Sequence, residues 1–272
     1  MKQYKVAIIG NGMICNAAHI PAYKAMGDKV KIVAVADIRE EAAKETAERH
    51  GIPKYYVDPY KMLEEEKPDI ISVCTPNAYH KEYTLAGFRA GCHVVCEKPV
   101  AVTCADAEEM FNAAEKAGKH LFVIQSLRFT GNFKAAAGLA KSGCLGDIYY
   151  ADLNLVRRRG VPRWGMFHMA KENVGGAFCD LGVHMCDYLM SISGNPKMVS
   201  VSGSAVTRIV NKEKNIEFSN AESGAPTGLF TPRKFDMKEF DVEEFANGYI
   251  RLENGMTVTF KISWALNLSL IH

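Results

Sequence analysis

Short continuous apolar runs recur through the first half of the chain, and segments with helical periodicity separate them. A strand of a parallel sheet is covered on both faces, so it reads as an unbroken apolar run rather than as an alternation. Strands that alternate with helices predict a doubly wound parallel sheet with right-handed crossovers. The runs cover residues 6–9, 31–36, 54–56, 69–75, 93–96 and 120–125, and the helical segments cover residues 39–50, 59–66, 79–90 and 105–117.

The pattern changes after Ser126. Few helices follow, and the later strands are joined by hairpin-like turns such as Asn254-Gly255. This arrangement predicts an α+β domain with a largely antiparallel, open sheet, so we expect two domains, residues 1–125 and 126–272. The predicted helices cover residues 131–142 and 176–192, the strands 147–159, 198–208, 242–252 and 256–266, and a surface loop 216–241.

The first apolar run ends in a glycine turn. Gly10 suits a tight turn, and Gly12 allows the pyrophosphate of a dinucleotide to approach the backbone. The helix start behind the turn offers free N–H groups and a partial positive charge to phosphates. Cys15 stands where the third small residue of such turns is usually glycine or alanine, and an ordinary strand–helix turn fits equally well. The predicted phosphate contacts are Gly10, Asn11, Gly12, Met13 and Ile14.

Asp37 ends the second run, at the spacing where a dinucleotide-binding unit places an acid on the adenosine ribose. A carboxylate there accepts hydrogen bonds from both ribose hydroxyls and repels a 2′-phosphate. The sequence therefore favours NAD(H), while Arg39 keeps NADP(H) open. Cofactor and substrate gather beyond the carboxyl ends of parallel strands, which brings the loops with Asn77 and Lys98 to the same place.

Asp180 and His184 lie four residues apart on a predicted helix and therefore share a face. Oxidation of a secondary alcohol by a nicotinamide needs a base for the hydroxyl proton, and histidine titrates near neutrality. A lysine such as Lys98 stabilises negative charge on the oxygen, and Asp180 orients the histidine or accepts a second hydroxyl. A core histidine, a helix ion pair and a surface salt bridge are the structural alternatives.

Arginine and indole side chains gather where the long strand of the second domain ends. Guanidinium donors and an indole face suit polyhydroxylated ligands and sugar rings. Arg157 and Trp164 are predicted to bind substrate, and so is Arg128, just past the domain junction. A solvated strand end explains any one arginine equally well.

Composition excludes several classes of protein. The 33 basic and 31 acidic residues nearly cancel, and no basic tract points to nucleic acid. No apolar run reaches the ~20 residues of a membrane-spanning helix, and the chain starts directly in a strand with no room for a signal peptide. The eight cysteines form no Cys-x-x-Cys pair. They predict free thiols in a reducing, cytoplasmic compartment and no metal site.

Five motifs in order resemble the Gfo/Idh/MocA oxidoreductases, which include glucose–fructose oxidoreductase and inositol dehydrogenases. The resemblance implies a nicotinamide cofactor on an N-terminal Rossmann domain, Lys98 and His184 with Asp180 at the reacting carbon, and Asn77 and His80 beside the nicotinamide. Sugars, cyclitols and related polyols are the implied substrates. The motifs are Gly10-Asn11-Gly12, Asp37, Thr75-Pro76-Asn77-Ala78-Tyr79-His80, Glu97-Lys98-Pro99 and Gly175-Gly176-Ala177-Phe178-Cys179-Asp180-Leu181-Gly182-Val183-His184.

Family members usually continue well past the strand that holds Ser263-Trp264-Ala265, so the second sheet is expected to be shortened and to leave an edge for a partner. The leading prediction is an NAD(P)-dependent oxidoreductase that moves a hydride at a secondary hydroxyl or carbonyl of a sugar, cyclitol or polyol and forms a homo-oligomer through the C-terminal sheet. The alternatives are a glycosidase that retains NAD and cleaves by transient oxidation, and a catalytically idle NAD(P)-binding protein.

Overall fold

A six-stranded parallel sheet forms the first half of the molecule. The computed structural model describes residues 2–210 and 228–266. The strand order is β3-β2-β1-β4-β5-β6, so the direction of winding reverses between β1 and β4, and ligands bind in the crevice at such a point. The strands are β1 (Tyr4–Ile9), β2 (Val30–Ala36), β3 (Tyr55–Tyr56), β4 (Ile70–Val73), β5 (His93–Cys96) and β6 (Leu121–Val123).

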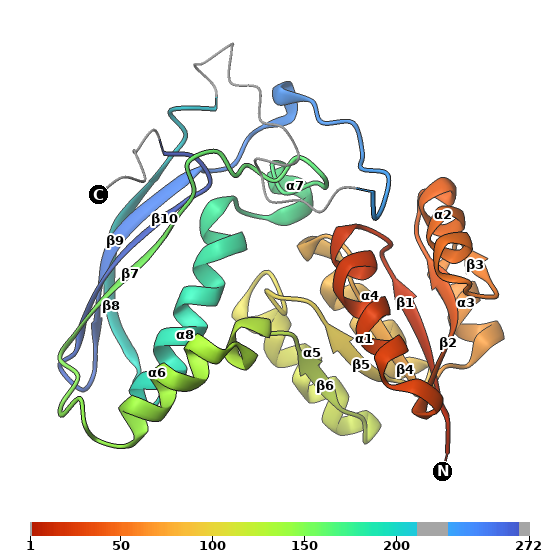
Figure 1. The fold of residues 1–272 in the computed structure, drawn as a ribbon, viewed down its shortest axis with the longest axis horizontal. Helices are drawn as coiled ribbons and strands as arrows, with labels where there is room; N and C mark the ends of the chain where they lie inside the picture. The colour runs from red at the N-terminus through yellow and green to blue at the C-terminus, as the bar shows by residue number, and fades with distance from the viewer. Residues whose placement is uncertain (1, 211–227, 267–272) are drawn as a thin grey trace.

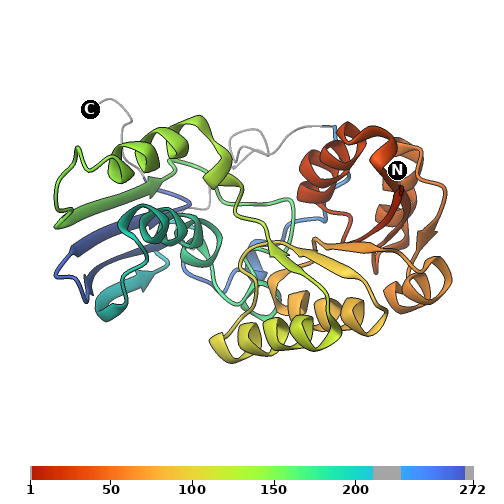
Figure 2. The same ribbon diagram turned by 90° about the horizontal axis from the view of Figure 1, so that it is seen from below.

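Helices cover both faces of this sheet (Figure 2). Alternate residues of β1 divide between two core clusters: Ala7 and Ile9 pack in one, and Val6 and Ile8 in the other. This two-sided burial is the physical reason that the strand reads as a continuous apolar run. The α-helices are α1 (Ile20–Ala25), α2 (Glu40–His50), α3 (Pro59–Glu66), α4 (His80–Arg89) and α5 (Cys104–Ala117). The domain also has the π-helix η1 (Cys15–His19) and the 3₁₀-helices η2 (Gly27–Lys29) and η3 (Asn77–Tyr79).

The second half of the molecule is built on a four-stranded sheet in the order β7-β10-β9-β8. β9 pairs antiparallel with β10 and β8, whereas β7 pairs parallel with β10, so the sheet is mixed. The strands are β7 (Tyr150–Val156), β8 (Met198–Val206), β9 (Phe245–Leu252) and β10 (Thr257–Ser263). The other elements are η4 (Ser126–Phe129), α6 (Gly131–Lys141), α7 (Ala170–Asn173), η5 (Phe178–Gly182), α8 (Val183–Ser193) and η6 (Met237–Glu239).

Among the residues that the structure describes, helices cover one face of the second sheet and leave the other uncovered. α6 and α8 lie on the face toward the first domain, and no helix is drawn on the outer face (Figure 1). Leu189 of α8 packs against Ile250 of β9 and Val258 of β10. Tyr249 of β9 and Lys261 of β10 are exposed. The alternation of buried and exposed residues along β9 is typical of a sheet with one solvated face.

Several predicted boundaries differ from the observed ones. The strand expected over residues 147–159 is shorter, and the helix expected over residues 176–192 starts as the π-helix η5 before it continues as α8. Residues 216–227 of the expected surface loop lie outside the described residues, as do residues 267–272 at the end of the chain. The domain boundary predicted at residues 125/126 falls between β6 and η4.

Two further expectations concern membranes and metals. In the described part of the chain, no helix is both long and apolar enough to cross a membrane. Among those same residues, no group of three or more His, Cys, Asp or Glu side chains is arranged to hold a metal ion. All eight cysteines, which lie within the described ranges, are unpaired.

Candidate functional site

The glycine turn at the end of β1 has the geometry of a phosphate site. Gly10 adopts φ +91°, and a Cβ built there would lie 2.6 Å from the backbone carbonyl of Cys74. No other residue type fits this position without displacing the neighbouring strand end. A Cβ built on Gly12 would meet no protein atom within 4 Å, so open space faces its backbone. The turn therefore fits a pyrophosphate brought close to the main chain.

The helix behind this turn packs tightly against the sheet. Met13 and Ile14 form its first helical residues and lead into η1. Cys15 is fully buried and packs with Ile20 and Tyr23. Burial raises the pKa of the Cys15 thiol to about 12, so this cysteine fills space where a small residue is required and offers no thiolate for chemistry.

Asp37 is fixed beside the glycine turn at the end of β2. Its Oδ2 accepts a hydrogen bond from the main-chain N–H of Asn11 at 2.8 Å, and its Oδ1 accepts one from the N–H of Arg39 at 2.9 Å. A carboxylate has about four acceptor positions, so two remain for ribose hydroxyls. The guanidinium of Arg39 lies 3.7 Å from the same carboxylate and is about a third exposed.

The loop after β4 holds the two domains together. Asn77 is buried, and its Nδ2 donates to the carbonyl of Asn173 in α7 at 3.0 Å. His80 is fully buried, with Nε2 lying 3.0 Å from the carbonyl of Thr75 and Nδ1 lying 2.7 Å from that of Pro99. Both ring nitrogens face backbone oxygens, so His80 fixes the loop, and a direct contact with nicotinamide stays a prediction. The hydroxyl of Thr75, which precedes Pro76, is buried without a partner.

Lys98 and Asp180 meet across the two domains. The ammonium of Lys98 donates to Oδ1 of Asp180 at 3.0 Å and to its main-chain carbonyl at 2.9 Å. The indole N–H of Trp264, directly after β10, donates to Oδ2 of Asp180 at 2.9 Å. Burial by itself would raise the pKa of Asp180, but the charge of Lys98 and the hydrogen bonds from Trp264 and Lys98 outweigh it and hold that pKa below its usual value.

His184 follows Asp180 by one helical turn, but the two side chains have different partners. Nδ1 of His184 is buried without a hydrogen bond. Burial lowers the pKa of His184, and the charge of Lys98 lowers it further, to about 4. The imidazole is therefore neutral at pH 7. Asp180 binds Lys98 and Trp264, and the Nδ1 atom of His184 does not bond to it. The predicted role of Asp180, to orient the histidine or to accept a second substrate hydroxyl, stays a prediction.

Besides Asp180 and His184, three residues are predicted to bind substrate, and each has different hydrogen-bond partners. Arg128 donates from Nε and Nη2 to Asp187 on α8 and so ties η4 to that helix. Arg157 donates to the carbonyl of Gly160 at 3.2 Å, and its charge helps to lower the pKa of Asp180. Trp164 is buried, and its indole nitrogen has no partner. Their contacts with substrate remain predictions.

Two contacts at this site were not predicted from the sequence. Trp264 lies far along the chain from Asp180, and the packing of η5 against the end of β10 brings the two side chains together. A usable signal exists, because a buried tryptophan usually needs a partner for its N–H. The second contact is between His19 and Glu97, whose Nε2 and Oε1 atoms lie 2.9 Å apart.

The fold and the site together define an oxidoreductase with a dinucleotide-binding domain. The chain belongs to the GFO/IDH/MocA family: the model of the oxidoreductase family with an NAD-binding Rossmann fold matches residues 4–125, and the model of the GFO/IDH/MocA C-terminal domain matches residues 133–269. The turn at Gly10–Gly12, the carboxylate of Asp37 and the unpartnered hydroxyl of Thr75 fit NAD on this chain.

Similar proteins are dehydrogenases of sugars and inositols. D-glucoside 3-dehydrogenase of Escherichia coli is 35% identical over 97% of this chain and 71% of its own length. Myo-inositol 2-dehydrogenase of Thermotoga maritima is 30% identical over 70% of this chain and 55% of its own length. The crystal structure of aldose-aldose oxidoreductase from Caulobacter crescentus, complexed with glycerol, superposes with a TM-score of 0.75 at 25% identity, covering 98% of this chain and 72% of that one.

Proposed function

We propose that this protein oxidises a secondary hydroxyl of a sugar, cyclitol or related polyol with NAD⁺ as the favoured acceptor, or reduces the matching ketone with NADH. One observation carries the proposal. A lysine ammonium from the first domain, and a carboxylate and a neutral imidazole from the second, lie together at the carboxyl ends of the parallel strands, where the glycine turn also lies. These are the groups that hydride transfer at an alcohol requires.

A D-glucoside is the first substrate to test, with the 3-hydroxyl as the reacting position. The relative that is 35% identical over most of this chain carries the name D-glucoside 3-dehydrogenase. Arg157 and Trp164 are the proposed contacts for the rest of the sugar, because guanidinium donors and indole faces suit polyhydroxylated rings. Arg128 lies at the domain junction and is the third proposed contact.

Each site residue has a proposed role that follows from its observed state. Bound NAD⁺ supplies the hydride acceptor. Neutral His184 accepts the proton of the substrate hydroxyl, which an imidazolium does not do. The ammonium of Lys98 has three donors; Asp180 takes two, which leaves one for the substrate oxygen. Asp180 holds this ammonium in place.

A panel of glucosides, free sugars and inositols, assayed for NADH or NADPH formation with each cofactor, tests the proposal. We expect turnover with a glucoside and NAD⁺, a loss of at least about 100-fold in kcat for Lys98→Met and His184→Ala, and retained NAD⁺ binding in both. Full turnover in both variants would contradict the assigned roles. Hydrolysis of nitrophenyl glycosides without net cofactor reduction would show an NAD-retaining glycosidase, and NAD⁺ binding without turnover on any substrate would show an idle binding protein.

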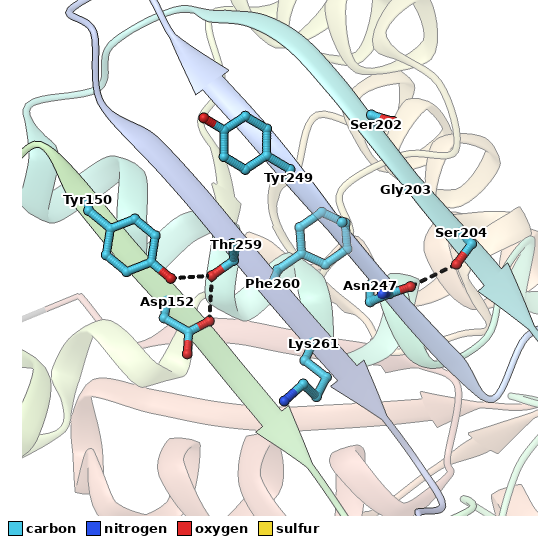
Figure 3. A pocket seen from close by; sticks show the side chains of 11 residues that line it. Tyr150, Asp152, Ser202, Gly203, Ser204, Asn247, Tyr249, Thr259, Phe260 and Lys261 are labelled. Carbon is cyan, nitrogen blue, oxygen red and sulfur yellow. Dashed lines mark hydrogen bonds between the residues drawn. The ribbon is translucent and has the colours of Figure 1, made fainter.

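We also propose that two copies associate through the outer face of the second sheet. Hydroxyl and amide side chains cover this face and bond across the strands: Tyr150 to Thr259, Thr259 to Asp152, and Ser204 to Asn247 (Figure 3). Asp152 and Lys261 give the face both signs of charge, so a two-fold pairing can match each with the other. Sheets pack face to face in this way.

Sedimentation velocity tests this interface. We expect the wild-type chain to sediment as a dimer or a higher oligomer and Lys261→Glu with Tyr249→Asp to sediment as a monomer, because the two changes place like charges in the contact. Lys116→Glu, on the exposed surface of α5, is the matched charge control. A monomeric wild type would end this proposal.

The free thiols and the balanced charge further support a cytoplasmic protein without nucleic-acid or membrane partners.

A further inference from the structure

The backbone turn that carries Lys98 is held by a buried contact between His19 and Glu97. Nε2 of His19 lies 2.9 Å from Oε1 of Glu97, and Oε2 of Glu97 accepts the main-chain N–H of Lys98 at 3.2 Å. His19 and Glu97 are each only 7% exposed. A hydrogen bond between such groups is stronger in a buried site than in water, so the carboxylate of Glu97 has one preferred orientation.

His19 comes from the helix that starts at the phosphate turn. It is the last residue of η1, a five-residue π-helix, and the other π-helix among the described residues is η5, which carries Asp180. π-helical turns are rare and occur mostly at functional sites. In this chain both serve the same turn: η1 supplies the partner of Glu97, and η5 supplies the partner of Lys98.

We propose that His19 is a positioning residue for Lys98. It fixes the Glu97 carboxylate, which holds the Lys98 amide, and the turn then directs the Lys98 ammonium to Asp180 and the substrate oxygen. The inference rests on the proposed role of Lys98 in polarising that oxygen. His19 also links the helix at the cofactor phosphates to the lysine, because η1 follows the glycine turn directly.

The atom that makes the contact decides which substitution preserves it. The contact uses Nε2, and a glutamine amide nitrogen reaches about as far from the backbone as Nε2, whereas an asparagine amide nitrogen reaches only as far as Nδ1. His19→Gln therefore keeps a donor for Glu97, and His19→Asn removes it. His120→Asn is the matched control, since His120 is exposed and precedes β6 at the opposite end of the strands.

The experiment compares these three variants of the full chain in two measurements. The first is kcat and KM with NAD⁺ and methyl β-D-glucoside; the second is the distance from Lys98 Nζ to Asp180 Oδ1 in a crystal structure of each variant. We expect His19→Asn to lengthen this distance and to lower kcat about 10- to 100-fold, because displacement of a reacting group by about 1 Å reduces the rate by up to about this factor. His19→Gln and His120→Asn should retain kcat, the KM for NAD⁺ and the distance.

A double-mutant cycle with Glu97→Gln separates positioning from a general structural role. If His19 acts through Glu97, the double variant His19→Asn with Glu97→Gln loses no more kcat than the worse single variant. Additive losses, or equal kcat and equal distances in His19→Asn and His19→Gln, would overturn the proposal. If the wild type oxidises no substrate, the proposed function fails. The distance from Lys98 Nζ to Asp180 Oδ1, compared between His19→Asn and His19→Gln, still decides whether His19 positions Lys98.

Discussion

At the scale of single residues, neighbours set the chemistry of this site more than residue type does. Asp180 and His184 are one helical turn apart and differ sharply: the first is held as a carboxylate by Lys98 and Trp264, and the second is held neutral by burial and by Lys98. One ammonium thus lowers the pKa of both groups. The proposed proton abstraction near pH 7 requires these two states: the Asp180 carboxylate is charged and holds Lys98, and the His184 imidazole is neutral and can accept a proton.

Removal of the Lys98 charge should change the titration of His184. In Lys98→Met the imidazolium no longer faces a positive neighbour, so the pKa of His184 should rise from about 4, while burial, the larger cause, keeps it below 6.5. Proton NMR titration of the histidine Cε1–H signals measures this. His93 serves as an internal control, because burial and Lys119 lower its pKa and Lys98 is not among the causes. An unchanged His184 titration would contradict the assignment.

In the wild type, the same low pKa predicts a wide working range on the acid side. His184 becomes protonated only as the pH falls through about 4. We therefore expect kcat/KM to stay level from pH 7 down to about pH 5, whereas an unperturbed histidine, with a pKa of about 6.5, would lose most of its base form over that range. A pH profile of kcat/KM checks this, and an acid limb centred near 6.5 would contradict it.

The two tryptophans of the second domain provide a matched pair. Trp264→Phe removes a donor to a buried carboxylate and should lower the free energy of unfolding by about 1.5–3 kcal/mol. Trp164→Phe removes an indole nitrogen that has no partner, so it should cost clearly less. Urea unfolding of both variants measures the difference. Equal losses would show that indole volume, rather than the bond to Asp180, stabilises the fold.

At the scale of elements, the turn between β1 and the first helix shows that two glycines can be needed for different reasons. Gly10 is required by its own backbone, since its φ is positive and the strand end at Cys74 lies against it. Gly12 is required by nothing in the protein, because the space beside it is open. A side chain at position 12 would clash only with a ligand that occupies this space.

This contrast predicts different outcomes for the same substitution. Gly12→Ala should leave the free energy of unfolding within about 0.5 kcal/mol and weaken NAD⁺ binding by at least about tenfold, or about 1.4 kcal/mol. Gly10→Ala should lower the free energy of unfolding by more than about 2 kcal/mol, because both conformation and contact are unfavourable. Urea unfolding and calorimetric titration with NAD⁺ test this. Unchanged NAD⁺ affinity in Gly12→Ala would contradict the phosphate site.

At the scale of the whole molecule, the proposed active site lies between the two domains rather than within one of them. Asn77 and Lys98 reach from the first domain to Asn173 and Asp180 of the second. Placement of the proposed catalytic groups therefore depends on how the domains are held together. Arg128 with Asp187 adds a further contact from η4, at the junction, to α8.

Asn77→Ala tests this contact between the domains. The change leaves the buried carbonyl of Asn173 without its donor, which should lower the free energy of unfolding by about 1–3 kcal/mol. Asn112→Ala is the control, because Asn112 is exposed on α5 and alanine suits a helix well, so its effect should be near zero. Urea unfolding followed by tryptophan fluorescence reports on the second domain. Similar losses in both variants would show that Asn77 does not stabilise the contact between the domains.

Much of the architecture could be predicted because its signals are local. The apolar runs marked the strands of the parallel sheet, and Gly10 and Gly12 marked the phosphate turn. Boundaries were less accurate where a π-helix replaces the first turn of an expected α-helix, as at Asp180. Hydrogen-bond shifts of that kind depend on tertiary packing and leave no mark in hydrophobic periodicity.

The sequence by itself determined the fold class and the glycine turn, and it singled out Lys98, Asp180 and His184 as the groups proposed to act on the substrate, because each of these depends on residue type at short spacing. Only the tertiary structure decided their partners. Asp180 turned out to hold Lys98 rather than His184, Trp264 joined it from the end of β10, and His19 reached Glu97. These contacts join residues far apart in the chain. The packing of the two domains brings Lys98 to Asp180, and the packing of elements within each domain brings Trp264 to Asp180 and His19 to Glu97, so no local pattern in the sequence marks them.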